Sequence, residues 1–252
     1  MTWSPMFLIR WLHKWFGLVL GLQFLLWSVS GAVMALLDHH KVAAEDAILP
    51  VAQLPAPAGI QPLARVVETA GGPVTRLQLK PLYDRWVYEA TTASGVRLVD
   101  AASGALIPID GSKARELAVA RFSSQAPVVS VTHVAKPTLE TRDMTLPAWR
   151  VQFADPDNTA VIVSAATGEV LGAKNDTWRL WDIAWMLHIM DYKERQSFNH
   201  PLIITLAFAA AWLALSGLIL LFRSFRRSDV AWVLDPIEKM TEKRKTARVE
   251  AG

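Results

Sequence analysis

Histidine is the residue type that carries most of the chemistry this sequence could perform. The chain has six histidines, and five of them lie at or near the ends of two long apolar segments: His13, His39, His40, His188 and His200. Imidazole is the usual axial ligand of b-type haem, and an imidazole close to hydrocarbon carries a desolvation cost. The five are therefore candidate ligands. The sixth, His133, lies in a strand-like pattern, SVTHVA, and we interpret it as a surface or sheet residue.

Other chemistry is largely excluded by composition. The chain has no cysteine, which rules out disulfides, thiolate metal sites, covalent c-type haem and cysteine nucleophiles. It also has no GxGxxG, P-loop or GxSxG pattern, so we expect no nicotinamide or flavin site. An enzymatic role would be that of an oxidoreductase subunit that receives electrons from a donor elsewhere.

His13 begins a helical face rich in small residues. Helical spacing places Gly17, Gly21, Phe24 and Ser28 on the same face. Two interpretations stay open. The face is either a contact between helices, where glycines let backbones approach, or a bed for a flat porphyrin whose iron binds His13.

His188 lies in a segment, 177–192, that contains three tryptophans within eight residues. Trp181, Trp185 and His188 share one helical face, which is typical of a helix at the membrane boundary. His188 is either an interfacial residue with a wet edge or a ligand in an aromatic haem pocket. His39, His40 and His200 are candidate partners at the same membrane depth. A rival interpretation joins these four histidines in a zinc or copper site.

Two uncharged segments, 15–37 and 201–222, indicate membrane spans. A helix of 23 residues extends about 34 Å and crosses a hydrocarbon core of about 30 Å. The first segment is too long for a signal-peptide core, so we predict a retained span. Because His13 and His40 lie about 40 Å apart along a continuous helix, they cannot share one iron.

The distribution of charge predicts the orientation. Segments 1–14 and 223–252 together hold ten basic and five acidic residues, whereas 38–200 holds 16 basic and 18 acidic residues. The positive-inside rule places both termini in the cytoplasm and 38–200 in the periplasm of a bacterium. The sequence pI of 9.3 therefore reflects topology, and we expect no nucleic-acid partner.

The middle of the chain reads as an imperfectly duplicated α+β unit. A helical pattern at 59–72 precedes strand patterns at 75–82, 84–92 and 96–107, and a second helix at 112–122 precedes strand patterns at 128–135 and 147–172. The duplication aligns Trp86 with Trp149. An antiparallel sheet with one face covered by helix fits this order.

Several motifs resemble known families. The hairpin that ends in ATGEVLG is similar to a PepSY domain. The motifs RWLHKWFGLVLGLQFLLWSVSGAVMALL and WMLHIMDY, with the later LALSGLILLF, resemble the PepSY-associated transmembrane family through their Leu-His and Ser-Gly pairs. The resemblance covers the chain to about residue 227. It implies an α+β membrane protein in which two transmembrane helices flank a periplasmic PepSY-like domain built of a duplicated helix plus antiparallel meander.

The same resemblance suggests a function. Longer relatives with four spans include a ferric-siderophore reductase branch that binds b-type haem through histidines. The resemblance therefore implies haem b, with His13 and His188 at the Leu-His positions. We expect a haem-binding electron-transfer subunit of the inner membrane, in a homodimer or larger complex, with a cytoplasmic reductase or quinol as donor. The alternative is a non-enzymatic PepSY binding or inhibitory module anchored by two spans.

The predicted organisation follows from these observations. It comprises a cytoplasmic N-terminus (1–14), transmembrane helix 1 (15–37), a linker (38–58), the periplasmic PepSY-like domain (59–176), an interfacial Trp-rich helix (177–192), transmembrane helix 2 (201–222) and a cytoplasmic basic tail (223–252).

Overall fold

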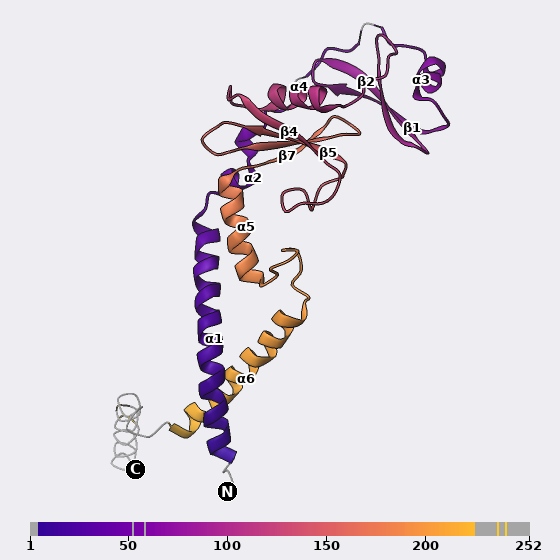
Figure 1. The fold of residues 1–252 in the computed structure, drawn as a ribbon. Helices are drawn as coiled ribbons and strands as arrows, with labels where there is room; N and C mark the ends of the chain where they lie inside the picture. The colour runs from indigo at the N-terminus through magenta and orange to yellow at the C-terminus, as the bar shows by residue number, and fades with distance from the viewer. Residues whose placement is uncertain (1–4, 52, 58, 225–235, 237–239, 241–252) are drawn as a thin grey trace, which may run out of the picture. The chain divides into compact units, whose positions relative to one another are not determined.

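The computed structural model describes residues 5–51, 53–57 and 59–224, together with Pro236 and Met240 (Figure 1). The predicted basic tail therefore lies almost wholly outside the described residues. In chain order the elements are α1 (Pro5–Leu36), α2 (His39–Ala43), η1 (Glu45–Ala47), α3 (Leu63–Ala70), β1 (Val74–Leu82), β2 (Arg85–Thr92), β3 (Gly95–Asp100), α4 (Gly111–Arg121), β4 (Val128–Val134), β5 (Ala148–Phe153), β6 (Ala160–Ser164), β7 (Val170–Lys174), α5 (Asp176–Ile189) and α6 (Pro201–Ser224).

The chain divides into two units. The helical unit comprises Met1–Ser28 and Ser197–Gly252, and the mixed unit comprises Val29–Gln196. Most of α1 belongs to the helical unit, and its last turns belong to the mixed unit.

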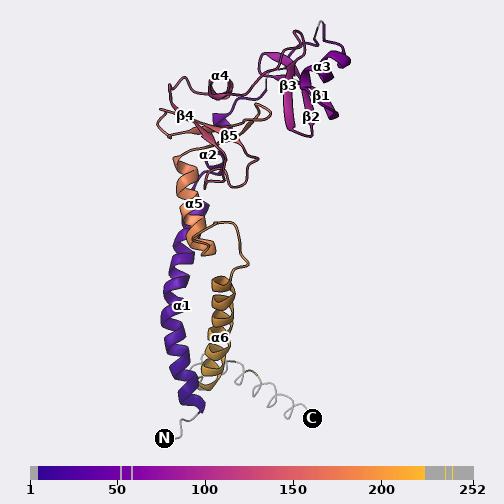
Figure 2. The ribbon, with the colours of Figure 1, turned by 45° about the vertical axis from the view of Figure 1, so that its right-hand side comes forward.

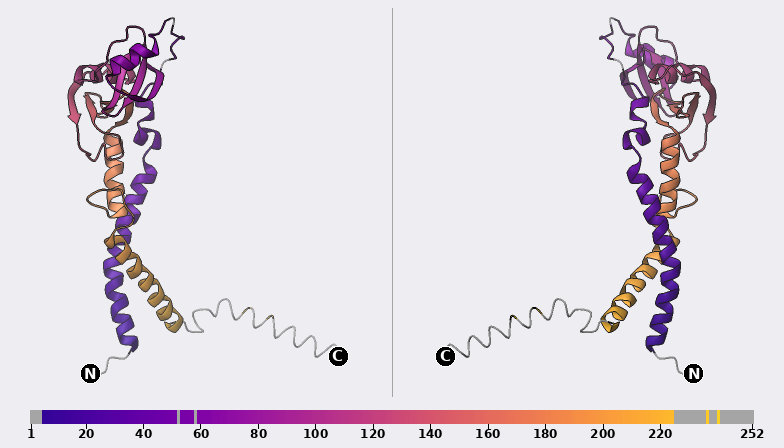
Figure 3. Two further views of the ribbon diagram at one scale, coloured as in Figure 1. Left: turned by 90° about the vertical axis from the view of Figure 1, so that its right-hand side faces the viewer. Right: turned by 90° about the vertical axis from the view of Figure 1, so that its left-hand side faces the viewer.

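Within the helical unit, α6 lies beside the N-terminal part of α1 (Figures 1 and 3). A Cβ placed on Gly17 would lie 3.7 Å from Cδ1 of Leu213. Both helices are long and apolar enough to cross a membrane, and only 11% and 6% of the residues in their most apolar windows are buried. A core helix of a soluble protein would bury most of these side chains, whereas lipid-facing side chains stay exposed.

The mixed unit contains two antiparallel sheets, one of order β1-β2-β3 and one of order β4-β5-β6-β7 (Figure 2). Successive side chains of a strand point to opposite faces of the sheet. The larger cluster of buried apolar side chains, which we call the main core, includes Val87 of β2 and Phe153 of β5. The residue after Val87, Tyr88, packs in a smaller cluster with Val66 of α3. Helix α3 therefore covers one face of the first sheet, as the sequence suggests, and side chains of the other face pack with the second repeat.

The duplication is clearest at two turns that lie 64 residues apart. The backbone N–H of Asp100 and that of Ser164 each donate to the carbonyl five residues later. Both side chains accept hydrogen bonds from the backbone two and three residues on. Gly104 and Gly168 follow at φ +74° and +69°, a conformation that favours glycine. The two repeats therefore end in the same turn.

Strand pairing sets the register of the repeats. Val99 of β3 faces Tyr88, and the equivalent Val163 of β6 faces Trp149. Tyr88 and Trp149 are therefore equivalent, and the alignment of Trp86 with Trp149 is wrong by two residues. Because a shift of two residues keeps every side chain on the same face, the hydrophobic pattern could not detect the error.

Residues 38–58, which the sequence suggests as a linker, include ordered elements. Helix α2 begins after Asp38, and Ala44 is buried in the main core. Ile48 forms a β-bridge with Phe122. The side chain of Asn175, which caps α5, donates to the carbonyl of Lys41 and joins this segment to α5.

Candidate functional site

His13 lies against α6 in the helical unit. Its Nδ1 is 2.8 Å from Oγ of Ser216, a residue that is only 1% exposed. A Cβ placed on the next residue, Gly217, would lie 3.1 Å from Cε1 of the imidazole. The ring therefore contacts the helix backbone at a position where any larger residue would force it to shift.

The hydrogen bonds of Ser216 determine which nitrogen of His13 carries the proton. The hydroxyl of Ser216 donates to the carbonyl of Leu213 at 3.0 Å, and a hydroxyl has one hydrogen. It therefore accepts from the Nδ1–H of His13. The neutral ring then has a free lone pair on Nε2, for which the described residues provide no hydrogen-bond partner. This tautomer is the form of imidazole that binds a metal through Nε2.

His188 has an equivalent environment in the mixed unit. Its Nδ1 is 3.1 Å from Oγ of Ser30, which is 2% exposed. A Cβ placed on Gly31 would lie 3.4 Å from Cε1 of the ring. A second imidazole is thus held by a buried serine and faces a glycine.

In each site, the Leu-His motif of one helix meets the Ser-Gly motif of another helix, an arrangement that we call crosswise. The Leu-His of α1 meets the Ser-Gly of α6, and the Leu-His of α5 meets the Ser-Gly of α1. The paired residues are 203 and 158 positions apart in the chain. Sequence reasoning singled out the histidines but missed Ser30 and Ser216 as their partners. The repeated Leu-His and Ser-Gly motifs were the available signal, but local spacing cannot pair residues so distant.

The remaining histidines have different surroundings. His40 is exposed, and its Nδ1 is 2.7 Å from the carboxylate of Glu45. This hydrogen bond raises the pKa of His40 and favours the imidazolium, which cannot bind a metal. His39 is exposed at the start of α2, and His200 is half-buried just before α6. His133 is exposed on β4, with its ring centroid 4.8 Å from that of Trp149.

Helix α5, which carries His188, is attached to its surroundings by aromatic and ionic contacts. Trp181 and Trp185 stack with ring centroids 5.3 Å apart, as the shared face predicts. Asp182, only 1% exposed, lies 2.6 Å from a guanidinium nitrogen of Arg142 and 2.5 Å from one of Arg195. Removing one member would leave uncompensated buried charge, so this cluster fixes the helix in place.

A second ionic cluster lies near the start of α5. Glu140 accepts from Arg150 at 2.6 Å and from Arg179 at 2.9 Å. Burial disfavours the charged carboxylate, but the hydrogen bonds from the two arginines outweigh it and lower the pKa of Glu140.

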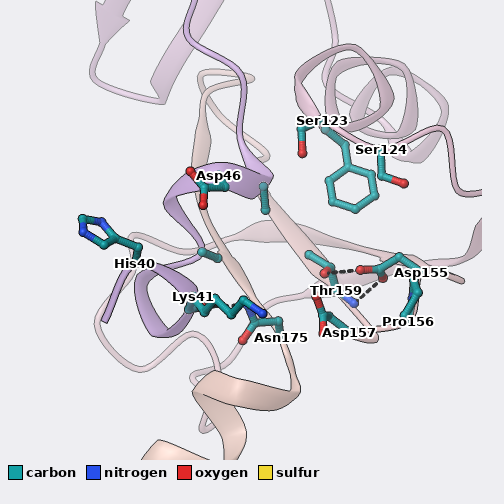
Figure 4. A pocket seen from close by; sticks show the side chains of 13 residues that line it. His40, Lys41, Asp46, Ser123, Ser124, Asp155, Pro156, Asp157, Thr159 and Asn175 are labelled. Carbon is teal, nitrogen blue, oxygen red and sulfur yellow. Dashed lines mark hydrogen bonds between the residues drawn. The ribbon is translucent and has the colours of Figure 1, made fainter. Parts of the chain in front are cut away.

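A polar cavity of about 270 Å³ lies beside α2 in the mixed unit (Figure 4). Asp155 lies on its wall and accepts from the backbone and the hydroxyl of Thr159, while the ring of His40 lies at the edge of the view, away from this pair. Within the described part of the chain, no group of three or more histidine, aspartate or glutamate side chains could hold a metal ion. The zinc or copper interpretation gains no support from these residues.

His13 and His188 would each offer one imidazole to a haem iron, which suits the chemistry of that group. Beyond His13 on α1, Gly21 has no atom within 4 Å of the position its Cβ would take, while Gly17 contacts Leu213. The glycine face is thus partly a helix contact and partly open.

Two exposed apolar helices flank a duplicated α+β unit, and this arrangement defines a membrane-anchored α+β protein. The model of the family described as the PepSY-associated TM region matches residues 10–249, and the chain belongs to this family. The expected family and fold class are thereby confirmed. No curated protein and no solved structure is significantly similar to the chain.

Proposed function

We propose that this membrane-anchored PepSY protein is a haem-binding electron-transfer subunit, with His13 and His188 as axial ligands. The crosswise imidazole–serine pairs carry the proposal, above all the tautomer of His13 that Ser216 selects. Haem b would supply reversible one-electron transfer. The residues of this chain orient each ring, and Ser216 keeps Nε2 of His13 available to iron, as outer hydrogen-bond partners do for metal-bound histidines.

A second copy of the chain completes each site in this proposal. Each imidazole–serine pair offers one axial ligand, whereas a six-coordinate bis-histidine haem needs two. Two spans also leave much of a porphyrin in contact with lipid. A homodimer or larger complex supplies the missing imidazole from another copy, while His39, His40 and His200 are the further candidates within the chain.

The direction of electron flow follows from the proposed topology. The charge distribution supports cytoplasmic termini and a periplasmic 38–200 in the inner membrane. A cytoplasmic reductase or a quinol is then the donor. The acceptor lies at the outer face, and a ferric siderophore or another oxidised metal complex matches the one-electron chemistry.

Absorption spectroscopy tests the proposal. The full chain, purified in detergent from haem-replete cells, should show a Soret band and a reduced α-band. The His13→Ala and His188→Ala variants should each lose haem, whereas His133→Ala, which changes an exposed sheet histidine, should not. A red protein whose spectrum both ligand variants leave unchanged would refute the ligand assignment.

A colourless protein would instead favour the binding or inhibitory module. Two cavities support that alternative. One is the polar cavity of Figure 4, and the other is a cavity of about 500 Å³ lined by residues of β1 and β7. Both belong to the mixed unit, and both could hold a ligand without any cofactor.

A further inference from the structure

A cavity in the helical unit brings two arginines to one place. It has a volume of about 330 Å³ and is lined by Arg10 of α1 and by the last turns of α6: Gly217, Leu220, Leu221, Arg223 and Ser224. Among the residues that the structure describes, neither arginine has a carboxylate partner. The cavity therefore combines two unpaired positive charges with an apolar wall.

This combination suits a ligand that is anionic at one end and apolar at the other. A guanidinium binds phosphate oxygens through two parallel hydrogen bonds, and basic pockets between transmembrane helices bind the headgroups of anionic lipids. The side chains of Leu220 and Leu221 would meet the acyl region. A free phosphate ion, which is strongly hydrated, would gain nothing from this wall.

We propose that Arg10 and Arg223 clamp the phosphate of an anionic phospholipid in this cavity. Ordinary snorkelling arginines at a span end would point independently toward the headgroups. Here both arginines, although exposed, line one cavity, whereas Lys14, one turn further along α1 and also exposed, is not among the residues that line it. The site does not depend on haem, but Gly217 contacts His13 as well, so the lipid would lie next to the imidazole–serine pair.

Native mass spectrometry of the full chain provides the test. The protein is exchanged into bilayers of phosphatidylcholine with or without phosphatidylglycerol. After the protein is released from the bilayer in the mass spectrometer, the lipids that stay bound to it are identified and counted. We expect wild type to retain phosphatidylglycerol in preference to phosphatidylcholine. The R10Q/R223Q double variant should reduce that preference by about tenfold or more, because it removes both charge-assisted contacts. The Lys14→Gln control removes one charge from the same helix and should keep the preference.

A second variant guards against changes in folding or orientation. R10K/R223K keeps both positive charges and hence the topological signal, but lacks the bidentate fork. We expect it to lose part of the preference. Any of three results would overturn the proposal: no preference in wild type, an equal loss in Lys14→Gln, or full displacement of the lipid by inorganic phosphate. The proposal would also be overturned if R10Q/R223Q lost haem while its lipid preference stayed equal to that of wild type. That result would assign the arginines to a porphyrin carboxylate.

Discussion

The single hydroxyl proton of Ser216 determines which ring nitrogen of His13 has a lone pair available to a metal. Because Ser216 donates to the carbonyl of Leu213, it can only accept from Nδ1 of the imidazole. The serine thus acts as a positioning residue for a ring nitrogen that it does not touch. Sequence reasoning could identify His13 by its type and its place near a span, but the partner serine lies 203 residues away.

We predict that Ser216→Ala weakens haem retention and shifts the reduction potential, because the ring of His13 loses its fixed tautomer and orientation. Ser216→Thr, which keeps the hydroxyl, should restore both. Ser224→Ala is the matched control, since Ser224 makes the same bond to the carbonyl three residues earlier without a histidine partner. Spectroscopic redox titration measures the shift. An equal shift in the Ser224→Ala variant would contradict the prediction.

Glu140 makes the stability of the mixed unit depend on pH. Its lowered pKa means that its contribution is fully present above the ordinary value of 4.5 and is lost as the pH falls through the lowered value. At pH 7, Glu140→Gln should reduce the free energy of unfolding by about 1–3 kcal/mol. The difference in the free energy of unfolding between wild type and variant should become smaller as the pH falls below 4.5.

Chemical denaturation of the full chain in detergent over this pH range measures the effect of Glu140→Gln. Glu116→Gln is the control, because Glu116 is half exposed and its ion-pair partner among the described residues is Lys113. This control should change stability by less than about 0.5 kcal/mol. A gap for Glu140→Gln that stays constant with pH would be inconsistent with the ionic role of Glu140.

At the scale of elements, periodicity was a good guide to what forms but a poor guide to what pairs. The apolar segments predict α1 and α6, and alternation predicts the strands, because burial of one face or exposure to lipid leaves a local pattern. The crosswise pairing of α1 with α5 and α6 depends on contacts between distant residues. Likewise, the residue of the first repeat that is equivalent to Trp149 follows from strand pairing next to the shared turn. The alternation of apolar and polar residues along the strand does not determine it.

Glycines beside the imidazoles provide a test at this scale. We predict that Gly217→Val displaces the ring of His13 and lowers stability by about 1–3 kcal/mol, since even a Cβ would lie 3.1 Å from the ring. Gly21→Val should leave stability unchanged, because the space around Gly21 is open. Thermal unfolding of both variants without haem distinguishes them. Equal destabilisation would show that the imidazole contact at Gly217 is unimportant.

For the whole molecule, charge remains the best guide to orientation. Basic residues concentrate in 1–14 and 223–252, and the family match supports a membrane protein. The exposed apolar faces of α1 and α6 agree with lipid as their surroundings. The spans and the orientation can be predicted from composition, because insertion into a bilayer depends on the hydropathy and charge of whole segments rather than on contacts between single residues.

The absence of cysteine makes the predicted orientation easy to test. A cysteine at Ser94, in the exposed β2–β3 turn, should react with a membrane-impermeant maleimide once the outer membrane is permeabilised. A cysteine at Ser224, at the end of α6, should react only after lysis. Cysteine-free wild type is the background control. Labelling in the opposite order would reverse the topology and the proposed direction of electron flow.

The crosswise exchange of motifs also constrains the order of biosynthesis. The ribosome makes His13 long before its partner Ser216, and Ser30 long before its partner His188. The first span must therefore enter the bilayer with its polar groups uncovered and wait for the rest of the chain. Neither imidazole–serine pair can close in a nascent chain that ends before α5, so both pairs form only after α5 and α6 have been made.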